Sequence, residues 1–163
     1  MKRFYTLLDR ASDALRFIGA IALAGMMLLT VADVIGRAFK HPIFGSVELV
    51  GFMAVIVMAA AMPYTYKMEG HVGVEIAVRH LSRKTRLRID LLTRTLSLFL
   101  FGIIAWQMFL YADDIRKTGE VSMNLEFPVY YIVYLLAAGL LIFSVTILER
   151  IMDTARQLKE LKI

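Results

Sequence analysis

Residues 127 to 148 read FPVYYIVYLLAAGLLIFSVTIL, a run of 22 residues that contains no Asp, Glu, Lys, Arg or His. At about 1.5 Å of rise per residue, a helix of this length crosses the roughly 30 Å hydrocarbon core of a bilayer. Inside lipid, only helices and closed barrels satisfy their backbone hydrogen bonds, and this run lacks the alternation of barrel strands. The stretch therefore predicts a membrane-spanning helix.

Three earlier segments have the same character. Residues 17–36 carry Asp33 as their only charge, and neither residues 49–66 nor residues 95–112 carry any. Continuous apolar runs of this length predict an all-α, polytopic membrane protein with four transmembrane helices. We expect a single membrane domain over residues 1–163, with helices at about 14–38, 43–66, 83–117 and 127–153.

Composition agrees with a membrane protein and excludes several classes of function. Of the 163 residues, 59% are hydrophobic and the mean hydropathy is +0.66, whereas soluble domains have roughly 45–50% apolar residues. The chain has no cysteine, which excludes iron–sulfur clusters, cysteine-based zinc sites and thiol catalysis. The net charge of +5 is better explained by orientation in a membrane than by nucleic acid, so no nucleic-acid partner is expected.

The basic residues predict the orientation of the helices. Of the 19 Lys and Arg residues, only Arg37, Lys40, Arg116 and Lys117 lie beside the loops after the first and third spans. Nearly all the others flank the termini or the loop between the second and third spans. By the positive-inside rule both termini and that central loop are cytoplasmic, and the other two loops face outward.

The central loop contains KMEGHVGVEIAVRHL, residues 67–81. Its apolar spacing fits either a helix or a strand, but a single strand has no partner here, so we expect a short interfacial element on the cytoplasmic surface, with His71, Glu75 and Arg79 exposed there. A metal or catalytic site is the alternative, but no third ligand is fixed, so neither a metal nor a cofactor is predicted. The basic residues that follow are placed to contact phospholipid headgroups. They are Arg83, Lys84, Arg86 and Arg88.

Charges also gather where the first two spans meet the outer surface. Asp33 and Arg37 are four residues apart on one helical face, and Glu48 opens the next helix after a short loop. Charged groups near lipid are costly unless paired, so these three predict a structural ion-pair cluster or subunit interface. A coupling-ion site, the alternative, would be expected nearer the midplane.

The other outward loop is acidic on balance, which suits a surface that meets a soluble partner and fits an ordinary solvated loop equally well. Its acidic residues are Asp113, Asp114, Glu120 and Glu126.

Residues 37–81, RAFKHPIFGSVELVGFMAVIVMAAAMPYTYKMEGHVGVEIAVRHL, resemble the small membrane subunit of tripartite ATP-independent periplasmic (TRAP) transporters, the DctQ type. The likeness rests on the order of features over about residues 17–153. They are Arg37 ending the first helix, Glu48 opening the second, the Gly70, His71, Val72 and Glu75 element, and Pro128 at the start of the fourth. Two features depart from the pattern: residues 45–47 lack a Trp common in the family, and Ala137 and Ala138 stand where a second Pro is common.

The resemblance implies a non-enzymatic scaffold. Such a subunit pairs with a large DctM-type membrane subunit that moves as an elevator. A periplasmic DctP-type binding protein delivers an organic acid for sodium-coupled uptake, and the outer loops of the small subunit help to receive it. The implied location is the inner membrane of a bacterium or archaeon, among phospholipids. The chain itself has no broken helices and no inverted repeat, which an independent carrier would be expected to show.

Three other classes fit the sequence less well. A haem or quinone protein needs histidines within its spans, whereas His41, His71 and His80 all lie outside them. An independent small exporter usually carries a carboxylate at the middle of its first helix, and Asp33 is near the end. A membrane enzyme needs convergent acid, base or nucleophile groups, which only the weak His71, Glu75 and His80 set offers.

Overall fold

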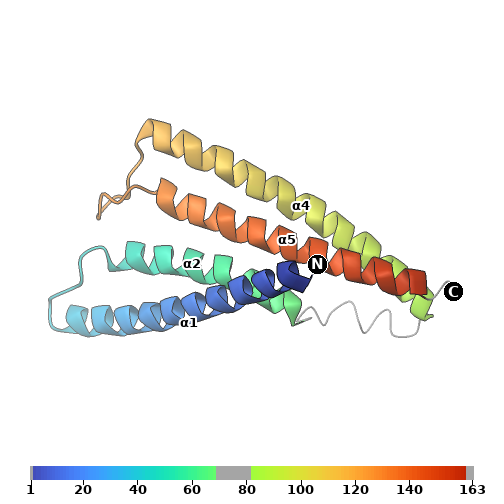
Figure 1. The fold of residues 1–163 in the computed structure, drawn as a ribbon. Coiled ribbons are helices and arrows are strands. Elements are labelled where there is room, and N and C mark those ends of the chain that lie inside the picture. Colours follow the sequence, from blue (N-terminus) through green and yellow to red (C-terminus); the bar gives the residue numbers. More distant parts are fainter. Residues whose placement is uncertain (1, 69–81, 161–163) are drawn as a thin grey trace.

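Four long helices make up most of the chain that the structure describes. The computed structural model describes residues 2–68 and 82–160, with side chains from residue 13 onward. Helix α1 covers Lys2–Ala38, α2 Ser46–Lys67, α4 Arg83–Thr118 and α5 Tyr130–Glu160 (Figure 1). All four are long and apolar enough to cross a membrane, which confirms the predicted fold class. The predicted interfacial element, with His71, Glu75 and Arg79, lies outside the described residues.

The predicted helix ranges overlap the observed helices but differ at their ends. Helix α1 begins at Lys2 and α5 continues to Glu160, so both helices extend beyond their apolar runs. Hydropathy marks only the part of a helix that meets lipid, and charged turns continue the same helix into water. Helix α2 begins at Ser46, a little later than expected, because Gly45 before it adopts the left-handed conformation with φ +70°.

The helices lie in the spatial order α1, α2, α5, α4. Helix α1 packs along α2, α2 along α5, and α5 along α4, so two hairpins meet through their inner helices. Figure 1 shows α1 and α4 at opposite edges of this arrangement. The fold is therefore an open layer of helices, and its two edge helices each have one main neighbour.

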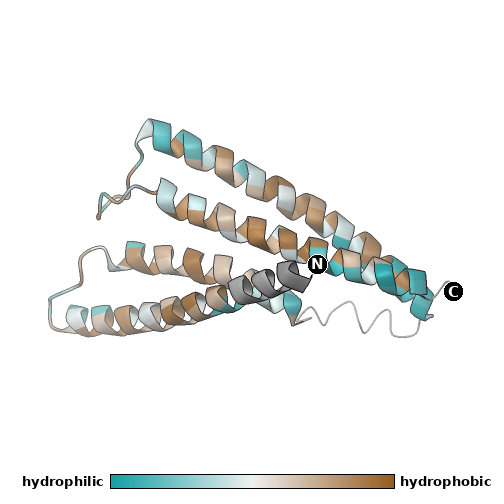
Figure 2. Cartoon of the chain, in the orientation of Figure 1, coloured by the Kyte–Doolittle hydropathy of each residue, from teal (hydrophilic) through white to brown (hydrophobic). Residues whose placement is uncertain are grey.

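Burial follows this order. Helix α5 buries a full face, including Leu140, Phe143 and Ile147, because it has a neighbour on each side. The edge helices instead expose large apolar side chains along their lengths. Figure 2 colours the hydrophobic residues of these helices brown. On α1 they include Phe17, Ile21, Met27, Leu28, Val31 and Val34, and on α4 Leu92, Leu96, Phe99, Leu100, Ile103 and Trp106. Such a surface has to be covered by lipid or by another protein.

The two hairpins approach most closely where α2 crosses α5. A Cβ added to Gly139 would lie 2.7 Å from the Cβ of Ala59 and 3.0 Å from the Ala59 carbonyl oxygen. Pro63 is buried four residues further along α2, and it has no N–H to donate to that carbonyl. Small residues thus let the two backbones come together, as they do in many membrane helix pairs.

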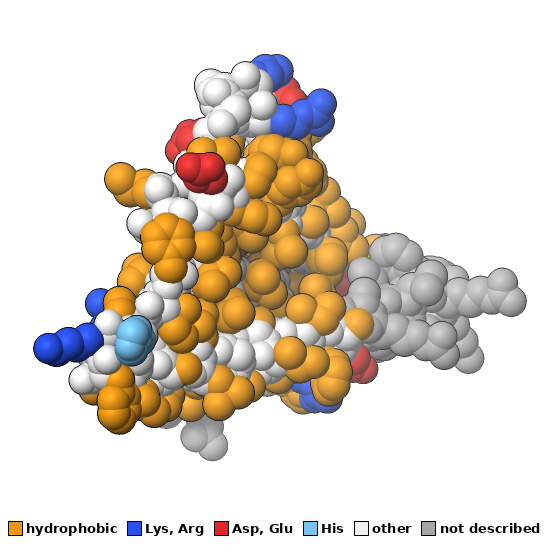
Figure 3. Space-filling model, turned by 90° about the vertical axis from the view of Figure 1, so that its left-hand side faces the viewer, with side chains coloured by type: hydrophobic (Ala, Val, Ile, Leu, Met, Phe, Trp, Pro, Cys, Tyr) orange, Lys and Arg blue, Asp and Glu red, His pale blue; other side chains and the backbone are white. Residues whose placement is uncertain are grey.

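The layer of helices has two ends. The Asp33 end comprises the loop of residues 39–45, the loop of residues 119–129 and the helix turns beside them. The Arg150 end comprises the last turns of α2 and α5 and the first turns of α4. Figure 3 looks onto the Asp33 end and shows charged side chains gathered over the end of α4, with hydrophobic side chains between the hairpins.

Candidate functional site

Asp33 closes the turn that joins α1 to α2. Its Oδ2 accepts a hydrogen bond from Arg37 Nε at 2.7 Å, and its Oδ1 accepts one from the Ile43 backbone N–H at 2.9 Å. The aspartate is buried, while the arginine side chain is 57% exposed. The structure thus brings the predicted pair together and adds a backbone partner. Asp33 fixes the loop while Arg37 balances its charge.

Glu48 is the third member of the predicted cluster, but it points elsewhere. Its Oε1 accepts hydrogen bonds from the backbone N–H of Asn124 at 2.7 Å and from the Asn124 side-chain amide at 2.8 Å. Its Oε2 accepts one from the Leu125 N–H at 3.0 Å. Because these donors point at an ionised group, the bonds are stronger than neutral ones. Glu48 therefore ties the α1–α2 hairpin to the loop that joins α4 to α5.

The loop of residues 119–129 folds back on itself around this contact. Ser122 N–H donates to the Phe127 carbonyl at 2.9 Å, and Val121 pairs with Pro128 in an isolated antiparallel bridge. The loop tip lies against the turn before α2: a Cβ on Gly45 would lie 2.5 Å from the Leu125 side chain. Gly45 is thus required both for its positive φ and for this close approach.

The four acidic residues predicted to meet a binding protein do not form one cluster. Asp113 accepts from Lys117 Nζ at 2.7 Å, and Asp114 lies 3.7 Å from the same nitrogen, so both lie beside one lysine on α4. Glu120 and Glu126 are exposed at the two sides of the folded loop. The acidic residues therefore lie on two elements, and Lys117 partly offsets the charge of the two on α4.

The Arg150 end holds a polar network that the sequence analysis did not identify. Arg94 Nη1 donates to Thr154 Oγ1 at 2.8 Å and to the Arg150 carbonyl at 3.2 Å. Arg150 Nη2 in turn donates to the carbonyl of Lys67 in the last turn of α2. Three helices are thus joined by two arginines, which in the sequence look like ordinary flanking charges. Phe143, Ile147, Arg150 and Thr154 recur every three or four positions, so all four share one face of α5. This spacing in the sequence indicates that Arg150 and Thr154 lie on the buried face of the helix.

The predicted headgroup residues lie in the first two turns of α4, which begins after the N-cap Ser82. Arg83, Lys84 and Arg88 are exposed, and Arg86 is half-buried. Among the described side chains, those of residues 13–68 and 82–160, no three His, Asp or Glu gather as metal ligands.

Comparison with known proteins gives one family. Residues 26–157 match the model of the DctQ component of tripartite ATP-independent periplasmic transporters. No curated protein and no solved structure gives a match. The matched range covers parts of all four helices and includes Asp33, Arg37, Glu48 and the loop that Glu48 holds.

Proposed function

Because the chain belongs to the DctQ family and is thus the small membrane subunit of a TRAP transporter, we propose that it is a non-catalytic scaffold for the large membrane subunit. In this proposal the large, DctM-type subunit carries the substrate and coupling-ion sites. The scaffold provides a fixed wall against which that subunit moves. The transported substrate is proposed to be an organic acid taken up with sodium.

The single observation that carries this proposal is the open layer of helices. A self-sufficient carrier encloses its substrate path between packed helices and usually interrupts a helix at the site. In the described chain the four helices are continuous, and the edge helices α1 and α4 keep their apolar faces exposed. Such a layer is suited to extend the membrane wall of a larger protein.

The Asp33 end supports a second part of the proposal, which is contact with the binding protein. The loop of residues 119–129 is held in a defined position by Glu48, and it presents Glu120 and Glu126 to solvent. We place this end on the periplasmic side and both termini in the cytoplasm, as the distribution of basic residues indicates. A DctP-type binding protein is then the partner that meets the loop.

Glu48 provides the test of the scaffold. Replacing it, Glu48→Ala, removes the acceptor of three hydrogen bonds and releases the loop, so we expect less large subunit to co-purify with the tagged chain. Glu126→Ala is the matched control, because it removes a glutamate from the same end without touching that contact. Apparent substrate affinity of the assembled complex should change little. A changed affinity with normal assembly would count against the scaffold.

The docking surface is tested separately by charge reversal. Glu120→Lys together with Asp113→Lys and Asp114→Lys should weaken the dependence of uptake on the binding protein, because the change replaces the acidic surface proposed to attract that protein with a basic one. Glu160→Lys, an exposed glutamate at the Arg150 end, is the control. Uptake that responds to the binding protein as before would remove the docking role and leave the scaffold intact.

A further inference from the structure

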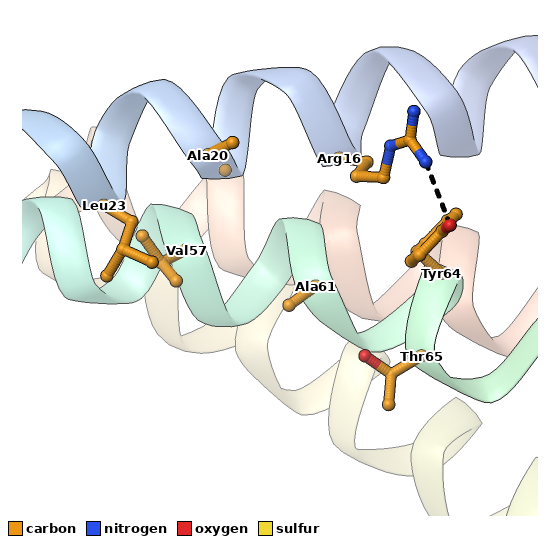
Figure 4. A pocket seen from close by; sticks show the side chains of 8 residues that line it. Arg16, Ala20, Leu23, Val57, Ala61, Tyr64 and Thr65 are labelled. Atoms are coloured by element: carbon orange, nitrogen blue, oxygen red, sulfur yellow. Dashed lines mark hydrogen bonds between the residues drawn. The ribbon is translucent and has the colours of Figure 1, made fainter. Parts of the chain in front are cut away.

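A groove of about 160 Å³ lies between α1 and α2 near the Arg150 end, open to the outside of the layer. Gly19, Ala20 and Leu23 line it from α1, and Val57 and Ala61 line it from α2 (Figure 4). Its lining is mostly apolar. A volume of this size accommodates a short length of acyl chain or one side chain.

One end of the groove is polar. Arg16 Nη1 donates to the Tyr64 hydroxyl at 2.9 Å, and the guanidinium carbon lies 4.9 Å from the centre of the Tyr64 ring. Both contacts hold the arginine against Tyr64, as Figure 4 shows, and both residues line the groove. Arg16 is exposed, and within the described part of the chain no carboxylate pairs with it. The guanidinium therefore retains donors and a positive charge for an anion.

The depth of these groups in the membrane matches an amphipathic ligand. Arg16 directly precedes the apolar run of residues 17–36, so it lies where the headgroups begin. From Arg16 to Leu23 the groove follows α1 toward the bilayer centre for about 10 Å, at about 1.5 Å per residue. A positive group at headgroup level and an apolar channel below it are complementary to one phosphate and one acyl chain.

We propose that this groove is a binding site for an anionic phospholipid, with the phosphate on Arg16 and an acyl chain between Leu23, Val57 and Ala61. The site is separate from the general headgroup contacts expected at the start of α4. It is also independent of the transport function, because it needs only this hairpin in a bilayer. Tyr64 holds the arginine in place when the lipid is absent.

The test uses phosphatidylglycerol with a photoreactive group on one acyl chain. The full chain is purified with the partners that accompany it and placed in phosphatidylcholine vesicles that contain this lipid. After illumination, peptide mass spectrometry locates the adducts. We expect them on residues 16–23 of α1 and 57–65 of α2, and inorganic phosphate should not compete.

Three variants make the result specific. Arg16→Gln removes the charge from an exposed position and should lower labelling of the groove about tenfold, the loss expected for one charge-assisted contact. Ala61→Phe fills the groove and should abolish labelling there. Arg83→Gln removes the same charge at the same end but outside the groove, and it should leave the labelling unchanged.

Other outcomes would overturn the site. Adducts spread evenly over the exposed faces of α1 and α4, or labelling that Arg16→Gln leaves unchanged, would mean that the groove is ordinary lipid-facing surface. Competition by inorganic phosphate would mean that Arg16 binds a free anion. A groove that stays unlabelled in the assembled complex but is labelled in the isolated chain would mean that a partner side chain occupies it.

Discussion

Gly139 of α5 faces Ala59 of α2 so closely that a Cβ on the glycine would lie 2.7 Å from the alanine Cβ. The two hairpins meet at this contact, and the added Cβ would also lie 3.0 Å from the Ala59 carbonyl oxygen and 3.1 Å from its Cα, so it would press on backbone as well as on the side chain. The position of the α4–α5 hairpin relative to the α1–α2 hairpin therefore depends on the absence of one methyl group.

The first prediction is that Gly139→Ala destabilises the protein although alanine is the better helix former. Overpacking of a tight contact costs about 1–3 kcal/mol, which exceeds the gain in helix propensity of about 1 kcal/mol. Thermal unfolding in one detergent measures the difference. Gly102→Ala on α4 is the matched control, because a Cβ there meets nothing within 4 Å, and it should be neutral or slightly stabilising. Equal effects of the two variants would contradict the close crossing.

The second prediction concerns the turn before α2. Gly45 and Gly119 have almost the same positive φ, +70° and +69°, so alanine strains both by about 1–2 kcal/mol. Only Gly45 also faces a side chain, that of Leu125. Gly45→Ala should therefore cost more stability than Gly119→Ala and should also release the 119–129 loop. Protease digestion of this loop, compared between the two variants, measures the release; identical digestion would refute the contact.

The third prediction separates the two members of the ion pair. Asp33→Ala removes both the partner of Arg37 and the acceptor for the Ile43 N–H, whereas Arg37→Ala removes only the exposed partner. We expect a loss of about 1–3 kcal/mol for the aspartate, which leaves a backbone donor unsatisfied, and under about 1 kcal/mol for the arginine. Chemical denaturation of the single and double variants measures the losses. A larger loss for Arg37→Ala would contradict this account and would mean that the cost of leaving the buried Asp33 carboxylate without its counter-charge outweighs the loss of the turn contact.

Much of the fold is predictable because lipid imposes a simple rule on sequence. Four apolar runs of sufficient length, with Asp33 as their only charge, fix the number and type of the spanning helices. The Asp33–Arg37 pair was equally predictable from the sequence, because residues four apart share a helical face and these two carry opposite charges. These features depend on neighbours in the chain, so one sequence is enough to find them.

The remaining features depend on which distant residues meet. Glu48 bonds to residues 76 and 77 positions away, and no local pattern specifies that partner. The spatial order of the helices also cannot be read from the sequence, because a helix face that meets lipid and one that meets another helix are equally apolar. Arg94 and Arg150 are a second example of contacts between residues that are far apart in the sequence. As flanking charges they contribute to the predicted orientation, but no local pattern specifies their contacts with the other helices.

The central claim is that this chain functions as part of a larger membrane complex. The most direct measurement is to tag the chain at its C-terminus, extract it from its native membrane in mild detergent, and identify by mass spectrometry the proteins that co-purify in fixed ratio. The account predicts one larger polytopic membrane protein, in a ratio that Glu48→Ala lowers and Glu126→Ala does not. A chain that purifies alone or as a homo-oligomer would contradict the scaffold role and favour an independent small exporter or a membrane enzyme.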